Sequence, residues 1–157
     1  VEKDRVLANV EVSSKLCYRI SKHYFSDRIQ VVTGPSMGGA MMAPFVAYYL
    51  EPKAIAVYAE GERDNRYFRS TVVDMIAGKR VLVVEDVLDT GGSVLRVIEA
   101  VERQGGEVVG IASIWNRGNV TFKHRLFCLV EHETYEPGEC PICKEGKIPL
   151  ENPSTLQ

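Results

Sequence analysis

A short acidic stretch that runs into a glycine pair is the part of this sequence best suited to chemistry. In VVEDVLDTGGSV, residues 83–94, the carboxylates of Glu85, Asp86 and Asp89 stand directly before the glycines. Carboxylates accept hydrogen bonds from hydroxyls such as the cis diol of a ribose, whereas backbone N–H groups exposed at a glycine turn suit a phosphate. A ribose 5-phosphate meets both demands. The same carboxylates would stabilise positive charge at the anomeric carbon of an oxocarbenium-like transition state.

The glycine turn is expected at the N-terminus of a helix, between a predicted strand and the segment Ser93–Gln104. It consists of Asp89, Thr90, Gly91, Gly92 and Ser93. Free N–H groups and the helix dipole give such a turn partial positive charge, and its two hydroxyl groups add donors. No Gly-Lys-Ser or Gly-Lys-Thr follows, so the turn differs from the ATP-type phosphate loop and favours a phosphate monoester. A surface turn with incidental acids is the alternative.

A second glycine-rich turn is predicted one crossover earlier, in TGPSMGGA, residues 33–40. Its candidate anion-binding residues are Gly34, Pro35, Ser36, Met37, Gly38 and Gly39. Taken alone this loop is weak evidence, because glycine is favoured at any turn from a strand to a helix. Its position before the acidic stretch makes a second phosphate site the better interpretation.

Short β-branched runs alternate with helix-length segments along the chain, which predicts an α/β fold. Strands are expected over Ile29–Thr33, Ala54–Ala59, Arg80–Glu85, Glu107–Trp115 and Leu126–Val130, and helices over Asn9–Phe25, Gly38–Leu50 and Ser93–Gln104. This order predicts a mainly parallel sheet flanked by helices, with ligands beyond the carboxyl ends of its strands. The chain is expected to leave the sheet at Glu85 and Asp86. Residues 1–133 form the predicted core, and residues 134–157 an irregular C-terminal extension.

The first predicted helix can be described more closely. Asn9 is its expected N-cap, and Val12, Leu16, Ile20 and Tyr24 are expected to share its apolar face.

Composition narrows the function classes. A net charge of -2 lacks the basic excess of a general nucleic-acid binder, so no nucleic-acid partner is expected. The most apolar run, residues 41–50, is about half the length needed to cross a bilayer, which predicts no membrane partner and a cytoplasmic location. The four cysteines are too few and too uneven for a secreted disulfide framework. Cys140 and Cys143 are read as part of a structural turn, with half of a zinc site or a redox pair as alternatives.

VVEDVLDTGGSV resembles the phosphoribosyl pyrophosphate signature of type I phosphoribosyltransferases, and this resemblance implies that family's fold. It implies that Glu85 and Asp86 hold the ribose hydroxyls, that residues 89–93 hold the 5-phosphate, and that Val87 and Leu88 are the apolar pair within the substrate-binding segment. Asp86 and Asp89 become catalytic candidates. The loop at residues 34–39 would bind pyrophosphate, and Mg²⁺ would be carried mainly by the substrate pyrophosphate rather than by a protein metal site.

The arginine-rich segment GERDNRYFRS, residues 61–70, occupies the place of the family's flexible loop. Arg63, Arg66 and Arg69 could supply positive charge to the leaving pyrophosphate, with Arg63 as the catalytic candidate, while closure excludes water. A solvated hairpin is the alternative. Orotate phosphoribosyltransferases usually carry lysines and a histidine here, and residues 57–77 contain neither. Loop sharing between subunits in this family implies a homodimer.

Two residues bear on the nucleobase. Arg117, in SIWNRGN at residues 113–119, matches an arginine with which orotate enzymes contact the base, and a guanidinium suits a carboxylated pyrimidine. Asp89 instead resembles the proton acceptor of 6-oxopurine enzymes. From this resemblance we expect the N-terminal hood of orotate enzymes to be absent or truncated. The sequence therefore predicts an orotate phosphoribosyltransferase. A purine phosphoribosyltransferase and a non-catalytic regulator that senses phosphoribosyl pyrophosphate remain the alternatives.

Overall fold

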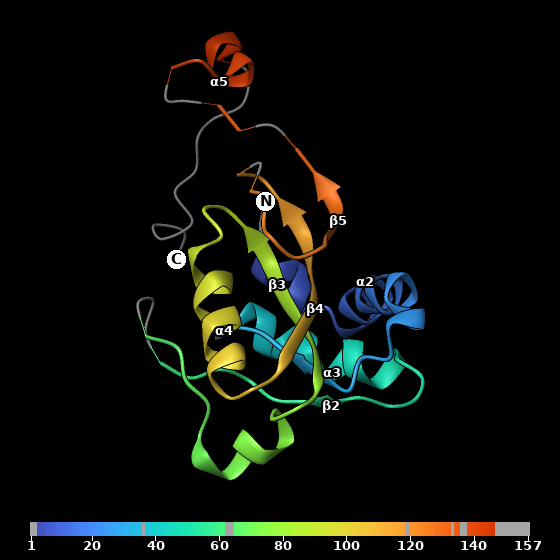
Figure 1. Ribbon diagram of the computed structural model, residues 1–157. Coiled ribbons are helices and arrows are strands. Elements are labelled where there is room, and N and C mark those ends of the chain that lie inside the picture. The colour runs from blue at the N-terminus through green and yellow to red at the C-terminus, as the bar shows by residue number, and fades with distance from the viewer. Residues whose placement is uncertain are drawn as a thin grey trace.

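The core of the protein is a five-stranded parallel sheet in the order β2-β1-β3-β4-β5 (Figure 1). The computed structural model describes residues 3–146 except 36, 62–64, 119, 133 and 136–137. The strands are β1 (Val31–Thr33), β2 (Ile55–Ala56), β3 (Arg80–Leu88), β4 (Glu107–Asn116) and β5 (Leu126–Glu131). The predicted parallel α/β architecture is therefore confirmed, and β3 lies at its centre.

Helices cover both faces of this sheet. They are α1 (Lys3–Ala8), α2 (Val10–His23), α3 (Gly38–Tyr49), α4 (Gly92–Arg103) and α5 (Pro141–Glu145), with 3-10 segments at η1 (Phe25–Asp27) and η2 (Ser70–Met75). Because successive strand residues point to opposite faces, Leu82 and Val84 pack with α2 and α3, while Val81 and Val83 pack with α4. The buried, β-branched character of β3 follows from this double coverage.

The N-terminal helix pair differs partly from its prediction. Asn9 caps α2 as expected, with its Oδ1 accepting a hydrogen bond from the Val12 backbone N–H at 3.1 Å. The side chain of Val12 is exposed, however, and Ser13 takes its place on the buried face. The Ser13 hydroxyl lies 3.0 Å from the carbonyl oxygen of Leu7, which satisfies a polar group at the junction with α1. Apolar spacing alone could not reveal this tertiary hydrogen bond.

Two strands have boundaries that differ from prediction. β3 continues to Leu88 instead of ending at Glu85, because its pairing with β4 runs through Val87 and Leu88. The expected exit from the sheet at Glu85 and Asp86 is therefore wrong. β2 has only two residues, although the next segment still follows β1: the Val57 N–H donates to the Val32 carbonyl at 3.0 Å.

The described part of the C-terminal extension includes a short helix. α5 covers five residues and lies beyond the carboxyl end of β5 (Figure 1). In the described part of the chain, no helix has the length and apolar character needed to cross a bilayer.

Candidate functional site

Two adjacent carboxylates lie inside the sheet, in the second half of β3. Glu85 and Asp86 are 8% and 3% exposed. The Asp86 N–H donates to Oε1 of Glu85 at 3.1 Å, and the Val87 N–H donates to Oδ1 of Asp86 at 2.8 Å. Both acids are buried because β4 pairs with this half of β3 on one side, while the loop after β1 lies against Asp86.

The two acids have different electrostatic surroundings. Desolvation, followed by the neighbouring charge of Asp86, raises the pKa of Glu85 to about 9. Glu85 is therefore mainly protonated near neutral pH. Asp86 has an opposite charge beside it: the Lys3 ammonium lies 2.8 Å from its Oδ2 atom. One of the two acids thus carries a proton, and the other forms an ion pair with Lys3.

The glycine loop after β1 lies directly against the acidic strand. A Cβ atom added at Gly38 would come 2.3 Å from the carboxyl carbon of Asp86, and one at Gly34 would come 2.3 Å from the carbonyl oxygen of Val84. Only glycine leaves room for this approach. Met37 has a φ of 68°, an unusual value for a side-chain-bearing residue, and its side chain is exposed. Ser36 lies outside the described residues.

The predicted phosphate turn joins β3 to α4. Gly91 has a φ of 75°, in the left-handed region, and α4 begins at Gly92, one residue before the predicted start. A small cavity of about 80 Å³ lies at this turn. It is lined by Glu85, Val87, Leu88, Asp89, Thr90, Gly91, Gly92, Ser93 and Val94. All of the predicted sugar-phosphate residues except Asp86 therefore meet around one cavity.

The two candidate base-binding residues are in contact. Arg117 donates from Nη2 to Oδ2 of Asp89 at 2.9 Å, and both side chains are about half exposed. The Arg117 backbone N–H also donates to the Leu88 carbonyl at 3.0 Å. At Gly118 an added Cβ would lie only 1.5 Å from the Asp89 carbonyl oxygen, so the chain after β4 packs tightly against the phosphate turn.

The described residues of the arginine-rich segment make contacts of the kind found in a hairpin. Glu60 and Tyr67 pair in an antiparallel bridge. Arg66 is buried and donates to the Gly61 carbonyl at 2.6 Å, while Arg69 forms an ion pair with Glu60. Arg63 lies outside the described residues. Both described arginines are therefore engaged within the hairpin in this state.

Lys3 is the site residue that sequence reasoning missed. It belongs to α1, a helix that was not predicted, and it lies 83 positions before its partner Asp86 in the sequence. The ion pair with Asp86 is long-range and depends on the packing of α1 beside β3, so no local pattern in the sequence signals it.

Among the described residues, no group of three or more His, Cys, Asp and Glu side chains is placed to hold a metal ion. Cys140 is the residue before α5, and Cys143 lies within this helix. A hydrogen bond between the two thiols is the main cause that raises the pKa of Cys143. These two thiols lie in the C-terminal extension.

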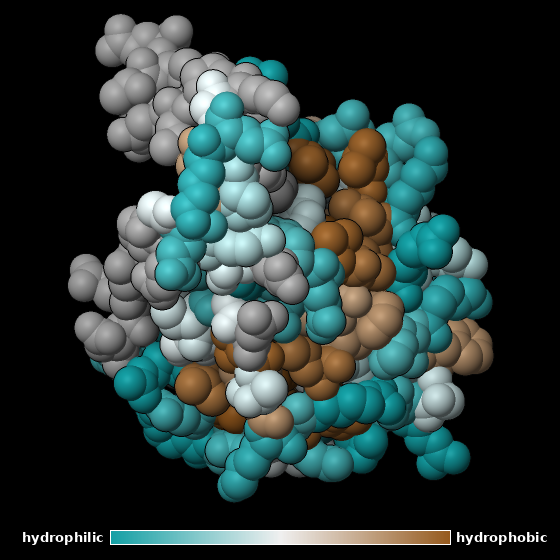
Figure 2. Space-filling model, turned by 90° about the horizontal axis from the view of Figure 1, so that it is seen from above, coloured by the Kyte–Doolittle hydropathy of each residue, from teal (hydrophilic) through white to brown (hydrophobic). Residues whose placement is uncertain are grey.

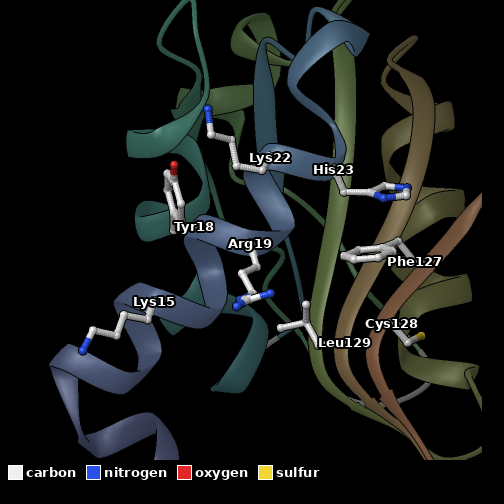
Figure 3. A pocket seen from close by; sticks show the side chains of 8 residues that line it. All are labelled: Lys15, Tyr18, Arg19, Lys22, His23, Phe127, Cys128 and Leu129. Atoms are coloured by element: carbon white, nitrogen blue, oxygen red, sulfur yellow. The ribbon is translucent and has the colours of Figure 1, made fainter.

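A cavity of about 830 Å³ lies away from the acids, between α2 and β5 (Figure 3). His23 stacks on Phe127 there, with ring centroids 3.8 Å apart. Lys15 and Lys22 also line it, but their ammonium groups point away from β5 (Figure 3). The lining therefore lacks the converging glycine turns and carboxylates of the site at β3.

The surface around the carboxyl ends of the strands is mixed. Seen from this end, bands of apolar surface are framed by hydrophilic surface (Figure 2). Other exposed apolar side chains include Met41 and Tyr48 on α3 and Ile55, the first residue of β2, which lies at the opposite end of the strands.

Comparison with known proteins identifies the family. A model of the phosphoribosyl transferase domain matches residues 4–135. This chain belongs to that family. It is 35% identical over 157 aligned residues to the orotate phosphoribosyltransferase of Desulforamulus reducens, covering 98% of this chain and 80% of the relative. It is 45% identical over 132 residues to the orotate phosphoribosyltransferase of Caldanaerobacter subterraneus, covering 82% and 67%.

Solved phosphoribosyltransferases share the fold. The orotate phosphoribosyltransferase of Mycobacterium tuberculosis in complex with 5-phospho-α-D-ribosyl 1-diphosphate superposes with a TM-score of 0.66 at 24% identity, covering 83% of this chain and 80% of the other. The adenine phosphoribosyltransferase of Rhodothermus marinus gives a TM-score of 0.63 at 22% identity, covering 81% and 83%. The predicted type I phosphoribosyltransferase fold is confirmed. Both curated relatives are orotate phosphoribosyltransferases, the activity predicted for this phosphoribosyltransferase.

Proposed function

We propose that this protein transfers a phosphoribosyl group from phosphoribosyl pyrophosphate to orotate in pyrimidine nucleotide biosynthesis. The products are orotidine 5′-phosphate and pyrophosphate. The observation that carries the proposal is the meeting, at the carboxyl edge of one sheet, of two glycine turns, two buried acids and a guanidinium. Each matches a different part of the two substrates. The relatedness to orotate phosphoribosyltransferases supports the choice of base.

Different residues bind different parts of the sugar phosphate. The turn at residues 89–93 binds the 5-phosphate through its N–H and hydroxyl groups, at the positive end of α4. Asp86 accepts hydrogen bonds from ribose hydroxyls, and protonated Glu85 can donate one as well as accept. As the bond to pyrophosphate breaks, the Asp86 carboxylate stabilises the positive charge on the ribose ring. The loop at residues 34–39 receives the leaving pyrophosphate.

Magnesium fits this arrangement as a companion of the substrate. Glu85 is protonated and Asp86 is paired with Lys3, so substrate oxygens and water supply the oxygen ligands that the ion prefers. When bound, the ion neutralises part of the pyrophosphate charge. The catalytic arginine expected at Arg63 would add positive charge on loop closure, and Arg66 and Arg69 would have to leave their hairpin contacts to do the same.

Arg117 is the proposed base-binding residue. Its guanidinium suits the carboxylate of orotate, and in the structure it already holds a carboxylate, that of Asp89. The carboxylate of orotate would therefore take the place of the Asp89 carboxylate as the partner of Arg117. In a purine enzyme Asp89 would instead accept a ring proton, but here its carboxylate is already engaged by the Arg117 guanidinium. This contact favours orotate over a 6-oxopurine.

Pyrophosphate release separates the candidate functions. The protein is mixed with phosphoribosyl pyrophosphate, Mg²⁺ and either orotate or hypoxanthine, and pyrophosphate is assayed. We expect release with orotate. Release with hypoxanthine only would refute the choice of base, and binding of phosphoribosyl pyrophosphate without turnover would establish the regulator instead.

Two variants test the assigned residues. Asp86→Asn should weaken use of the sugar phosphate with any base, whereas Arg117→Ala should weaken mainly the use of orotate. Equal losses for both substrates in the Arg117 variant would contradict its role.

A homodimer in the cytoplasm is part of the same proposal. The exposed apolar side chains Met41 and Tyr48 on α3 and Ile55 on β2 are suited to burial against a second subunit. Light scattering coupled to size-exclusion chromatography should give twice the chain mass, and Tyr48→Asp should shift the protein toward the monomer.

A further inference from the structure

Lys3 contacts the most deeply buried carboxylate of the site, although it lies far from that site in sequence. Its ammonium group is 2.8 Å from Oδ2 of Asp86, whose side chain is 4% exposed. The Lys3 side chain itself is 43% exposed. The pair therefore joins an accessible cation from α1 to an acid at the centre of the sheet.

The position of α1 is fixed by packing rather than by this ion pair alone. Leu7 is 6% exposed and belongs to the core cluster shared with α2 and α3. The hydroxyl of Ser13 on α2 lies 3.1 Å and 3.0 Å from the carbonyl oxygens of Val6 and Leu7. These contacts hold the helix that carries Lys3 against the fold, so the lysine is presented to Asp86 from a defined direction.

Lys3 and Glu85 dominate the electrostatic surroundings of Asp86. Among the described ion pairs, Lys3 is its single cationic partner, and Glu85 on the same strand is the acid next to it. The loop facing it contributes Gly38, which has no charge, while Asp4 on α1 further stabilises the charged Lys3. A buried carboxylate without a counter-charge takes up a proton, and two adjacent buried acids cannot both ionise readily.

We propose that Lys3 is a positioning residue of the transferase reaction: it keeps Asp86 charged and oriented toward the ribose hydroxyls of phosphoribosyl pyrophosphate. The proposal rests on the sugar-phosphate role assigned to Asp86 above. With Lys3 removed, the carboxyl group of Asp86 is neutral over more of the pH range. A neutral acid stabilises less positive charge on the ribose ring, so the chemical step slows irrespective of the base.

The test compares Lys3→Met with Lys3→Arg and with a matched control, Lys15→Met. Lys15 is a helical lysine on α2 that pairs with an acid, Glu11, at 2.5 Å, but the pair lies on the exposed surface. Lys3→Met should lower kcat/KM for phosphoribosyl pyrophosphate about tenfold or more at neutral pH and move the acid limb of its pH profile up by about one unit. Lys3→Arg should restore most of the loss, and Lys15→Met should match the wild type.

A second readout follows Asp86 without any substrate. Carbon NMR of its carboxyl group in the free protein should show a pKa that is higher in Lys3→Met than in the wild type or in Lys15→Met. Identical titrations and identical pH profiles for the two methionine variants would overturn the proposal, as would higher activity of Lys3→Met.

Failure of the proposed function gives a different result. If the wild type binds phosphoribosyl pyrophosphate but uses another base, the comparison runs with that base, because the ribose step is common to both. If phosphoribosyl pyrophosphate and Mg²⁺ do not raise the melting temperature of the wild type, the proposed function and the role of Lys3 are both refuted. If the wild type turns over and only the variant comparison fails, the role of Lys3 alone is refuted.

Discussion

Removal of the Asp89 carboxylate should strengthen the binding of orotate. Asp89→Asn keeps the shape of the side chain but deletes the negative charge that holds Arg117 at 2.9 Å. The two side chains are 59% and 49% exposed, so water screens the pair and its worth is about 0.2–1 kcal/mol. Orotate no longer has to displace this partner. Its KM should therefore fall about 1.4-fold to 5-fold.

The assay is a double-mutant cycle with Arg117→Gln, which removes the guanidinium and keeps an amide. Initial rates are measured against orotate at saturating phosphoribosyl pyrophosphate, because loss of charge beside the phosphate turn also changes binding of the sugar phosphate. Asp89→Asn should lower KM for orotate in the wild-type background and leave it unchanged in the Arg117→Gln background. A rise in KM, of equal size in both backgrounds, would show that Asp89 contacts the base directly and would refute the exchange of partners.

Three further substitutions follow from the contacts described. Gly38→Ala should lower activity at least tenfold and stability by about 1–3 kcal/mol, because its Cβ would displace the carboxyl group of Asp86 2.3 Å away; urea unfolding of Gly92→Ala, with its nearest contact at 3.6 Å, is the control. In the wild type the free energy of unfolding should fall by about 1.4 kcal/mol per pH unit as pH rises from 4.5 to about 9, and Glu85→Gln should remove this loss. The raised pKa of Glu85 makes its protonated form the stable one, so the wild type weakens as pH rises through this window, and parallel denaturation curves for both proteins would contradict this sign. Tyr24→Phe should cost about 1–3 kcal/mol of unfolding free energy, since it leaves a buried β4 carbonyl without the hydroxyl donor at 2.7 Å; an unchanged urea midpoint would contradict it.

Local chemistry explains what the sequence could predict. The phosphate turn is continuous in sequence, and its requirements, a left-handed glycine at Gly91 and a helix start at Gly92, act within a few residues. The alternation of strands and helices likewise predicted the parallel sheet. For this reason the predicted start of α4 lies within one residue of the observed start.

Features set by packing could not be predicted in the same way. β3 extends past Glu85 because β4 pairs with it, and this pairing places both acids in the interior. The contact of Lys3 with Asp86 depends on how α1 lies against the fold, and the pairing of Asp89 with Arg117 joins two loops 28 positions apart. Each depends on tertiary neighbours that no sequence window contains.

The tight approach of Gly118 to the carbonyl of Asp89 has a kinetic consequence. With no room for even a methyl group between them, the connection after β4 cannot settle independently of the turn after β3. A phosphate that orders the turn therefore also orders the place where the base binds. We expect an ordered addition of substrates, in which phosphoribosyl pyrophosphate enters first and the base follows.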